Sequence, residues 1–99
     1  MATVIITVKV TAPGTRQRVR NTLEKVAVID VKARDDNTAA MYFGTSDVAS
    51  TQGRELKAGK GLVLNYVNPI TGKGSELFSV FWVDADNSTD ELDVTAITS

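Results

Sequence analysis

The clearest clue to the fold is the segment at residues 3–11, which reads TVIITVKVT. One face of this segment carries only apolar side chains, namely Val4, Ile6, Val8 and Val10. Ile5 falls on the opposite face together with threonine and lysine side chains. A period of two is typical of a β-strand with one buried face. Residues 12–14, which read APG, then supply turn-forming chemistry that ends the strand.

The same alternation recurs along the rest of the chain. Residues 24–34 place Ala27, Ile29, Val31 and Ala33 on one face. Further short strands are predicted at residues 16–20, 38–43, 61–67, 77–83 and 92–97. No segment keeps a 3.6-residue apolar stripe for three turns, so no long helix is expected. The sequence therefore predicts one all-β domain over residues 1–99, a single antiparallel β-sandwich of jelly-roll-like or Greek-key type with about seven to eight short strands.

The composition limits the classes of function. The chain has 99 residues, 42% of them hydrophobic, with no cysteine and a net charge of −1. Without disulfides, so small a domain is expected to form an oligomer or to dock on a larger body. The near-zero charge argues against nucleic-acid binding. No segment is apolar enough for a membrane span, and residues 1–10 do not resemble a signal peptide.

The side chains most often used in catalysis are missing. The sequence contains neither histidine nor cysteine, which removes the usual general base, the thiol nucleophile and the commonest zinc ligands. Most of the carboxylates fall in predicted turns, where they are expected to accept backbone hydrogen bonds. No catalytic or phosphate-binding motif is present. We therefore expect no enzyme, no catalytic residue, no cofactor and no metal site.

One acidic turn raises the question of calcium. Asp84, Asp86, Ser88 and Asp90 lie at alternate positions, as oxygen ligands do at the start of a calcium-binding loop. The glycine and the glutamate that such a loop requires further along are replaced by threonines, Thr89 and Thr95. A polar hairpin explains the same residues without an ion, so the sequence leaves both interpretations open.

Two strands carry candidate residues for a protein interface. Arg16, Arg18 and Arg20 share one face of residues 16–20 and could pair with acidic groups of a partner. Alternatively, their charge protects an edge strand from aggregation. Residues 77–83, LFSVFWV, are apolar on both faces and predict a central or partner-covered strand. Phe78 and Trp82 would be core residues or interface anchors, and a sugar-stacking role for Trp82 is the alternative.

A loop supplies the remaining candidates. After Gly44 the chain passes through a polar segment, in which Ser46 and Asp47 are expected to cap backbone amides. Gly53 is expected to adopt a positive φ angle, and Gly59 is expected to turn the chain back into the next strand. The segment is interpreted as a stiff corner that could meet a partner, and Ser46 and Asp47 are added to the candidate interface.

Taken in order, these segments resemble small β-sandwich virion proteins of tailed bacteriophages, which act as capsid decoration (cement) or accessory head proteins. The resemblance rests on VTAPGTRQRV (10–19), VIDVKARDDNTAAMYFG (28–44), GTSDVASTQGRELKAGKGLVL (44–64) and LFSVFWVDADNSTDEL (77–92). The chain departs from the family pattern in two turns. Ala58-Gly59 stands where the family often has Pro-Gly, and the acidic turn lacks the family's usual glycine.

The resemblance implies a non-enzymatic structural protein on the exterior of the virion. It would bind the major capsid protein lattice and stabilise the head, as a homotrimer at local threefold axes and without nucleic acid or membrane. The alternatives are a tail, neck or fibre-type component, and a receptor- or carbohydrate-binding β-sandwich module.

Overall fold

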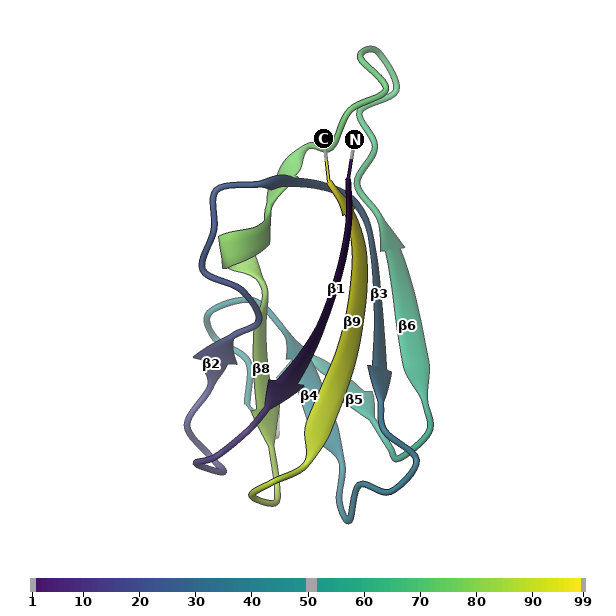
Figure 1. Cartoon of the computed structure of the whole chain (residues 1–99). Coiled ribbons are helices and arrows are strands. Elements are labelled where there is room, and N and C mark those ends of the chain that lie inside the picture. Colours follow the sequence, from purple (N-terminus) through teal and green to yellow (C-terminus); the bar gives the residue numbers. More distant parts are fainter. Residues whose placement is uncertain (1, 50–51, 99) are drawn as a thin grey trace.

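The computed structural model describes residues 2–49 and 52–98, which form nine strands and one 3₁₀ turn (Figure 1). The strands are β1 (Ala2–Lys9), β2 (Gln17–Arg18), β3 (Lys25–Ala33), β4 (Met41–Gly44), β5 (Arg54–Leu56), β6 (Gly61–Asn65), β7 (Glu76–Leu77), β8 (Trp82–Ala85) and β9 (Glu91–Thr98). The 3₁₀ turn, η1, spans Phe78–Val80. The described residues include no helix that is long and apolar enough to cross a membrane.

The strands form two antiparallel sheets that pack face to face. One sheet has the order β1-β9-β3-β6, with β7 pairing with the beginning of β3, and the other has the order β2-β8-β4-β5. The pairs are therefore nested along the chain: β1 with β9, β2 with β8, β3 with β6 and β4 with β5. This is the jelly-roll arrangement, in which one long hairpin is rolled into two sheets. The predicted all-β antiparallel sandwich is confirmed; of the two predicted types, jelly-roll-like or Greek-key, the strand order is that of a jelly roll, with nine strands in the described residues against the predicted seven to eight.

The predicted alternation of faces is also confirmed in the long strands. In β1, Val8 points into the core and is buried, whereas Ile5 on the opposite face is 76% exposed. In β3, Ile29 and Val31 are fully buried. They face residues of the same kind on β9, since Val31 lies opposite Val94 and Ile29 opposite Ala96.

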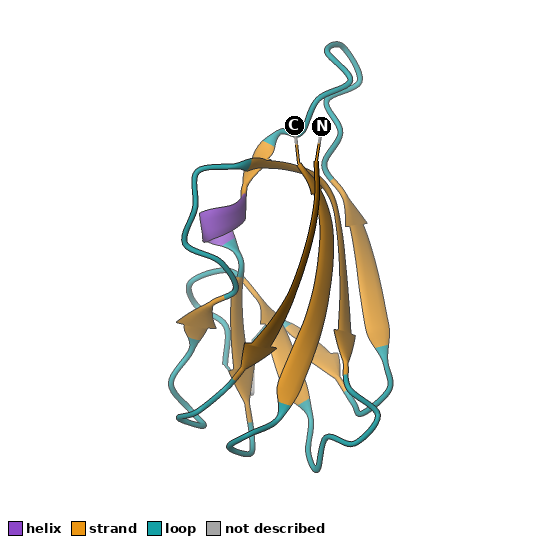
Figure 2. Ribbon diagram, viewed as in Figure 1, coloured by secondary structure: helices purple, strands orange, loops and turns teal. Residues whose placement is uncertain are grey.

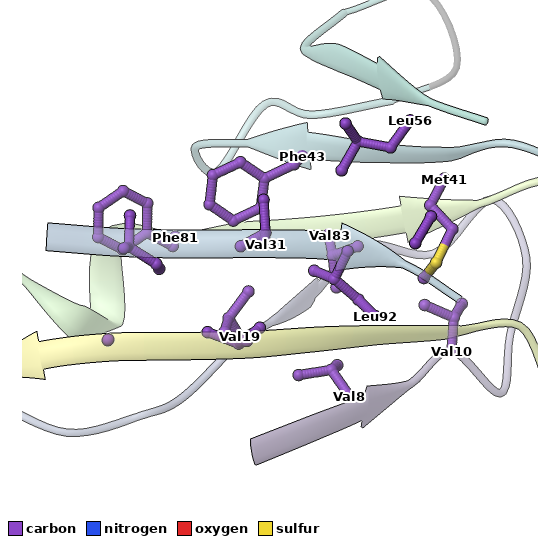
Figure 3. Packing of buried hydrophobic residues seen from close by; sticks show 14 of the residues in the cluster. Val8, Val10, Val19, Val31, Met41, Phe43, Leu56, Phe81, Val83 and Leu92 are labelled. Carbon is purple, nitrogen blue, oxygen red and sulfur yellow. The ribbon is translucent and has the colours of Figure 1, made fainter. Parts of the chain in front are cut away.

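An aromatic cluster joins the two sheets. The rings of Phe43 and Phe81 are nearly parallel, with centroids 5.6 Å apart and an interplanar angle of 12° (Figure 3). Tyr66, which follows β6 of the other sheet, places its ring 5.5 Å from Phe81. Phe81 therefore contacts aromatic residues from both layers, and we expect it to contribute strongly to the stability of the sandwich.

The prediction of one continuous strand over residues 77–83 is wrong. The segment divides into the end of β7, the turn η1 and the beginning of β8 (Figure 2). The Phe81 amide donates to the Phe78 carbonyl at 3.3 Å. Because residues three apart share a face in a 3₁₀ turn, Phe78 and Phe81 are both buried, and they do not alternate as a strand would require.

Three further segments differ from the prediction. The arginine-containing strand at residues 16–20 shortens to the two residues of β2, and the strand predicted at residues 38–43 begins only at Met41. The corner at residues 44–60 contains an unpredicted strand, β5, which pairs with β4. The predicted positive φ angle of Gly53 is confirmed, at 106°, and Gly59, which was predicted to turn the chain back, has a φ angle of 80°.

A long loop between β6 and β7 rises above the sandwich (Figure 1). It is a hairpin, in which the Asn68 amide donates to the Lys73 carbonyl at 2.7 Å and the Ser75 amide to the Tyr66 carbonyl at 3.0 Å. Ile70, near its tip, is 92% exposed. The loop therefore displays an apolar side chain on a hydrogen-bonded frame.

Candidate functional site

Trp82 lies at the centre of the candidate site, on the outer face of the sheet β2-β8-β4-β5. It is the first residue of β8, and its neighbours Phe81 and Val83 are both buried in the core. Successive side chains in a strand point to opposite faces, so the indole is directed outward. Arg18 of β2 and Gly44 of β4 lie opposite Trp82 in the two neighbouring strands.

The Trp82 ring is covered on one side by an arginine. The guanidinium carbon of Arg18 lies 4.9 Å from the ring centroid, which is within the range of a cation–π interaction. Gly44, on the other neighbouring strand, has no side chain to place over the ring. The indole is consequently only partly buried, and the rest of its surface is available for contact.

Two shallow hollows flank the indole. One, of about 280 Å³, is lined by Arg18, Thr45, Ser46, Ser79, Val80 and Trp82. The other, of about 360 Å³, is lined by Gly14, Thr15, Arg16 and Trp82. The fold thus brings together four of the residues that the sequence proposed for a partner interface: Arg16, Arg18, Ser46 and Trp82. We call these four residues the Trp82 patch.

The Trp82 patch carries uncompensated positive charge. Arg16 and Arg18 are both exposed, and neither forms an ion pair with any other residue in the described ranges 2–49 and 52–98. A guanidinium group binds a carboxylate through two parallel hydrogen bonds. The chemistry of the patch therefore suits an acidic group placed beside an aromatic or apolar one.

Ser46 belongs to a loop that is held in place by the buried side chain of Val48. The Val48 side chain is 1% exposed, and its amide donates to the Thr45 carbonyl at 2.9 Å. The predicted capping of backbone amides by Ser46 and Asp47 does not occur among the described residues. Instead, the Thr45 hydroxyl donates to Asp47 Oδ1 at 2.9 Å. Ser46 stays at the surface, where it lines the smaller hollow.

Three of the predicted interface residues, Asp47, Phe78 and Arg20, lie outside the Trp82 patch. Phe78 has no exposed surface and belongs to the core. Arg20 lies over it, with the guanidinium carbon 5.7 Å from the ring centroid, and Arg20 Nε lies 3.1 Å from Glu24 Oε1. Both side chains hold the connection between β2 and β3 onto the sandwich, and the fold places neither of them in the Trp82 patch.

The carboxylates of the acidic turn are directed to different partners. Asp84, which is 3% exposed, accepts hydrogen bonds from the amides of Gly14 at 3.0 Å and Ala85 at 2.8 Å. Asp86 Oδ2 accepts the Tyr42 hydroxyl at 2.6 Å. Asp84 thereby fixes the β1–β2 loop beside Trp82, which positions Arg16 at the edge of the larger hollow.

Asp90 also accepts hydrogen bonds from the backbone. Its two carboxylate oxygens accept the amides of Thr38 and Ala39, each at 3.0 Å, and the residue is 3% exposed. Among the described residues, no group of three acidic side chains is arranged to hold a metal ion. Asp84, Asp86 and Asp90 thus each accept hydrogen bonds from a different part of the chain.

The hydrogen bond to Asp86 also changes the chemistry of Tyr42. Together with burial of the ring, it raises the pKa of Tyr42 from 10.0 to about 12, because ionisation would place a phenolate beside a carboxylate. Tyr42 consequently remains a neutral hydrogen-bond donor at physiological pH. Its hydrogen bond to Asp86 links β4 to the turn that follows β8, in the sheet on which the Trp82 patch lies.

Some exposed apolar residues were not among the sequence candidates. Val63 on β6 is 61% exposed, Val67 and Ile70 in the β6–β7 loop are 39% and 92% exposed, and Leu23 is 80% exposed. For Val63 the sequence did contain a signal, since it is out of phase with Leu62 and Leu64. For Ile70 the signal was an apolar residue among the turn-forming residues of NPITG.

No protein-family model, no curated protein and no solved structure matches the chain.

Proposed function

We propose that this protein is a non-enzymatic structural component of a tailed-bacteriophage particle, which binds the outer face of the major capsid protein lattice and reinforces the head. The proposal rests on the resemblance of the sequence segments to small β-sandwich virion proteins. The jelly-roll topology agrees with that resemblance. The observation that carries the binding role is the Trp82 patch, where an outward indole is flanked by two arginines that form no ion pair within the described part of the chain.

The composition of the patch supports a role as the main energetic contact. Tryptophan and arginine are the residues most enriched where a few side chains supply most of the binding energy of an interface. Trp82 would insert into an apolar recess of a capsid subunit, while Arg16 and Arg18 would bind carboxylates at its rim. Where such a pair loses water on binding, bidentate geometry offsets the cost of desolvation, and the arginine guanidinium is suited to this geometry.

Reinforcement of a shell requires more than one attachment point. As the resemblance implies, we include a homotrimer in the proposal, because three linked copies bind more tightly than each contact alone through high effective concentration. Such an oligomer would span several capsid subunits and oppose their separation.

The experiment that tests this proposal is cosedimentation of the purified protein with capsids that lack it, followed by cryo-electron microscopy of the pellet. We expect saturable binding at symmetric lattice positions. Trp82→Ala should weaken binding by roughly 30-fold, the effect of losing about 2 kcal/mol at a dominant contact. Leu23→Ala removes an exposed apolar side chain outside the patch and should leave binding unchanged. Absence of binding by the wild-type protein would overturn the capsid proposal.

A second candidate, a carbohydrate- or receptor-binding module, is favoured by one observation. The hydroxyl groups of Thr45, Ser46 and Ser79 line the hollow beside the Trp82 ring, and an aromatic face with nearby hydroxyls suits a sugar ring. Trp82 is the single tryptophan of the chain, so its fluorescence reports on this site alone. A saturable emission shift with host-surface glycans, without capsid binding, would favour this candidate.

A further inference from the structure

The outer edge of β1 presents unpaired backbone groups. Within its sheet, β1 pairs only with β9. The Val10 amide donates toward the β9 side, to Asp90, whereas the Lys9 carbonyl faces the other way and accepts the Gln17 side chain at 3.1 Å. Backbone groups in a strand alternate in direction, so odd-numbered positions turn theirs away from β9.

The outward positions before Lys9 are Thr3, Ile5 and Thr7. Across the ranges 2–49 and 52–98, no backbone hydrogen bond outside the β1–β9 ladder reaches any of the three. These amides and carbonyls therefore form a row that can accept one more strand.

The side chains of β1 favour the addition of a strand. Residues 3–8 are six consecutive β-branched residues, without proline or glycine, and the only charged residue of β1 is Lys9 at its end. Apolar groups are exposed on both sides of this edge. Ile5 is 76% exposed on the outer face, and Val4 and Ile6 are only partly buried on the inner face. The usual protections of an edge strand are thus missing from β1.

We propose that β1 pairs antiparallel with β1 of a second copy of this chain, about a two-fold axis at Ile5. Residues at equal distances before and after Ile5 are of the same type. Ile5 would face Ile5 of the second copy, Val4 would face Ile6, and Thr3 would face Thr7. Each match places like side chains together and keeps the inner and outer faces of both sheets continuous. The outward backbone groups of one copy then meet those of the other, as an antiparallel ladder requires.

The opposite edge of the same sheet is a weaker candidate. β6 has five residues against eight in β1, and it includes Gly61 and Asn65, which are poor strand formers. Pairing through β6 would therefore form a shorter and less apolar ladder. The β1 contact is isologous and joins two copies, so it links two protomers, or two homotrimers if the proposed trimer is correct. It does not depend on capsid binding.

The test is the molar mass of the purified protein in solution, measured by light scattering after size-exclusion chromatography. Ile5→Lys places two like charges opposite each other at the axis and should halve the mass, with association weakened by about tenfold or more. Val63→Lys makes the same exchange on the same outer face at the β6 edge, where the side chain is 61% exposed, and should leave the mass unchanged. Circular dichroism of both variants checks that they fold.

Each other outcome overturns the proposal. An Ile5→Lys variant with wild-type mass would show that β1 is not an interface. A loss of mass in both variants would show pairing of β1 with β6, and a loss in Val63→Lys alone would show pairing through β6.

A mixture of two variants tests the register. Ile5→Lys and Ile5→Glu should each have half the wild-type mass, and their mixture should recover it as a species containing both chains, detected by native mass spectrometry. The reason is that opposite charges would then face each other at the axis. A mixture that stays at half mass would overturn pairing centred on Ile5. Because no capsid is used, this result stands apart from the test of the proposed function.

Discussion

The two sheets of the sandwich end in different ways. The sheet β2-β8-β4-β5 is bounded by strands of two and three residues, and these carry Arg18, Arg54 and Glu55. The sheet β1-β9-β3-β6 is bounded by strands of eight and five residues in which apolar side chains predominate. Short, charged edges resist strand addition, whereas long apolar edges invite it. In the two proposals made above, the first sheet accordingly binds a partner through its outer face and the second through an edge.

The largest effect should follow from breaking the contact that joins the sheets. Phe81→Ala removes the ring that contacts Phe43 on one side and Tyr66 on the other, and we expect a loss of about 3–5 kcal/mol in the free energy of unfolding. Trp82→Ala, one residue further, removes an outward and partly exposed ring and should cost about 1 kcal/mol. Urea denaturation measures both. Equal losses would contradict the assignment of Phe81 to the core and Trp82 to the surface.

A smaller effect is expected at the junction between the sheets. Asp90 precedes β9 of one sheet and accepts the amides of Thr38 and Ala39, which precede β4 of the other. Asp90→Ala leaves both amides without an acceptor and should cost about 2–3 kcal/mol. Asp90→Asn keeps one acceptor oxygen and should cost less. Thermal unfolding of the two variants provides the comparison. An Asp90→Ala variant as stable as the wild type would contradict the role of Asp90 in joining the two sheets.

The hydrogen bond on the outer face of the β2-β8-β4-β5 sheet predicts a pH dependence. Because the folded-state pKa of Tyr42 is about 12, against 10.0 for the ordinary side chain, the unfolded chain loses this proton first as the pH rises. The stabilisation is complete below pH 10 and is lost between about pH 10 and pH 12.

Tyr42→Phe should cost about 1 kcal/mol at neutral pH. It should also remove this part of the alkaline loss, which denaturation at a series of pH values measures. Wild-type and variant curves with the same alkaline slope would argue against the Tyr42–Asp86 contact.

The smallest effect is expected in the turn that links β8 to β9. Thr89 has a φ angle of 71°, which is strained for a β-branched residue, and this is the acidic turn that lacks the glycine of the resembled family. Thr89→Gly should relieve the strain and, after the entropy cost of glycine, stabilise the protein by about 0.5–1 kcal/mol. Thr89→Ala keeps the strain and should give no gain. The midpoint of thermal unfolding distinguishes these two variants.

The sequence predicted the long strands well because burial imposes a simple period on them. In β1 and β3 every second side chain is apolar and faces the opposite sheet. This alternation is visible in the sequence without knowledge of the partner strand. β5 was missed because only Leu56 of its three residues is buried. Its place is set by pairing with β4, which is a tertiary effect.

The sequence predicted the residues of the Trp82 patch as interface candidates, but it did not predict how they are arranged in space. Arg16, Arg18, Ser46 and Trp82 come from three separate segments, and only the order β2-β8-β4 brings them together. Phe78 lies in the core, which is one of the two roles considered for it, but its assignment to a strand was wrong because the apolar run suggested a continuous strand. The polar Ser79 within that run was the signal of a break, and the 3₁₀ turn then directs Phe78 and Phe81 into the same core.

The pairing of β1 with β9 has a consequence for the order of events during synthesis. Ala2 lies opposite Thr98 and Lys9 opposite Glu91, so β1 is synthesised well before the strand with which it pairs. Bringing such distant segments together is slow, since a long loop must close before any contact is gained. Throughout that interval the most apolar strand edge of the chain is without a partner on either side. The nascent chain is therefore most exposed to misassociation before residue 98 emerges. Later release of β1 from the ribosome, or a chaperone that binds β1, would protect it.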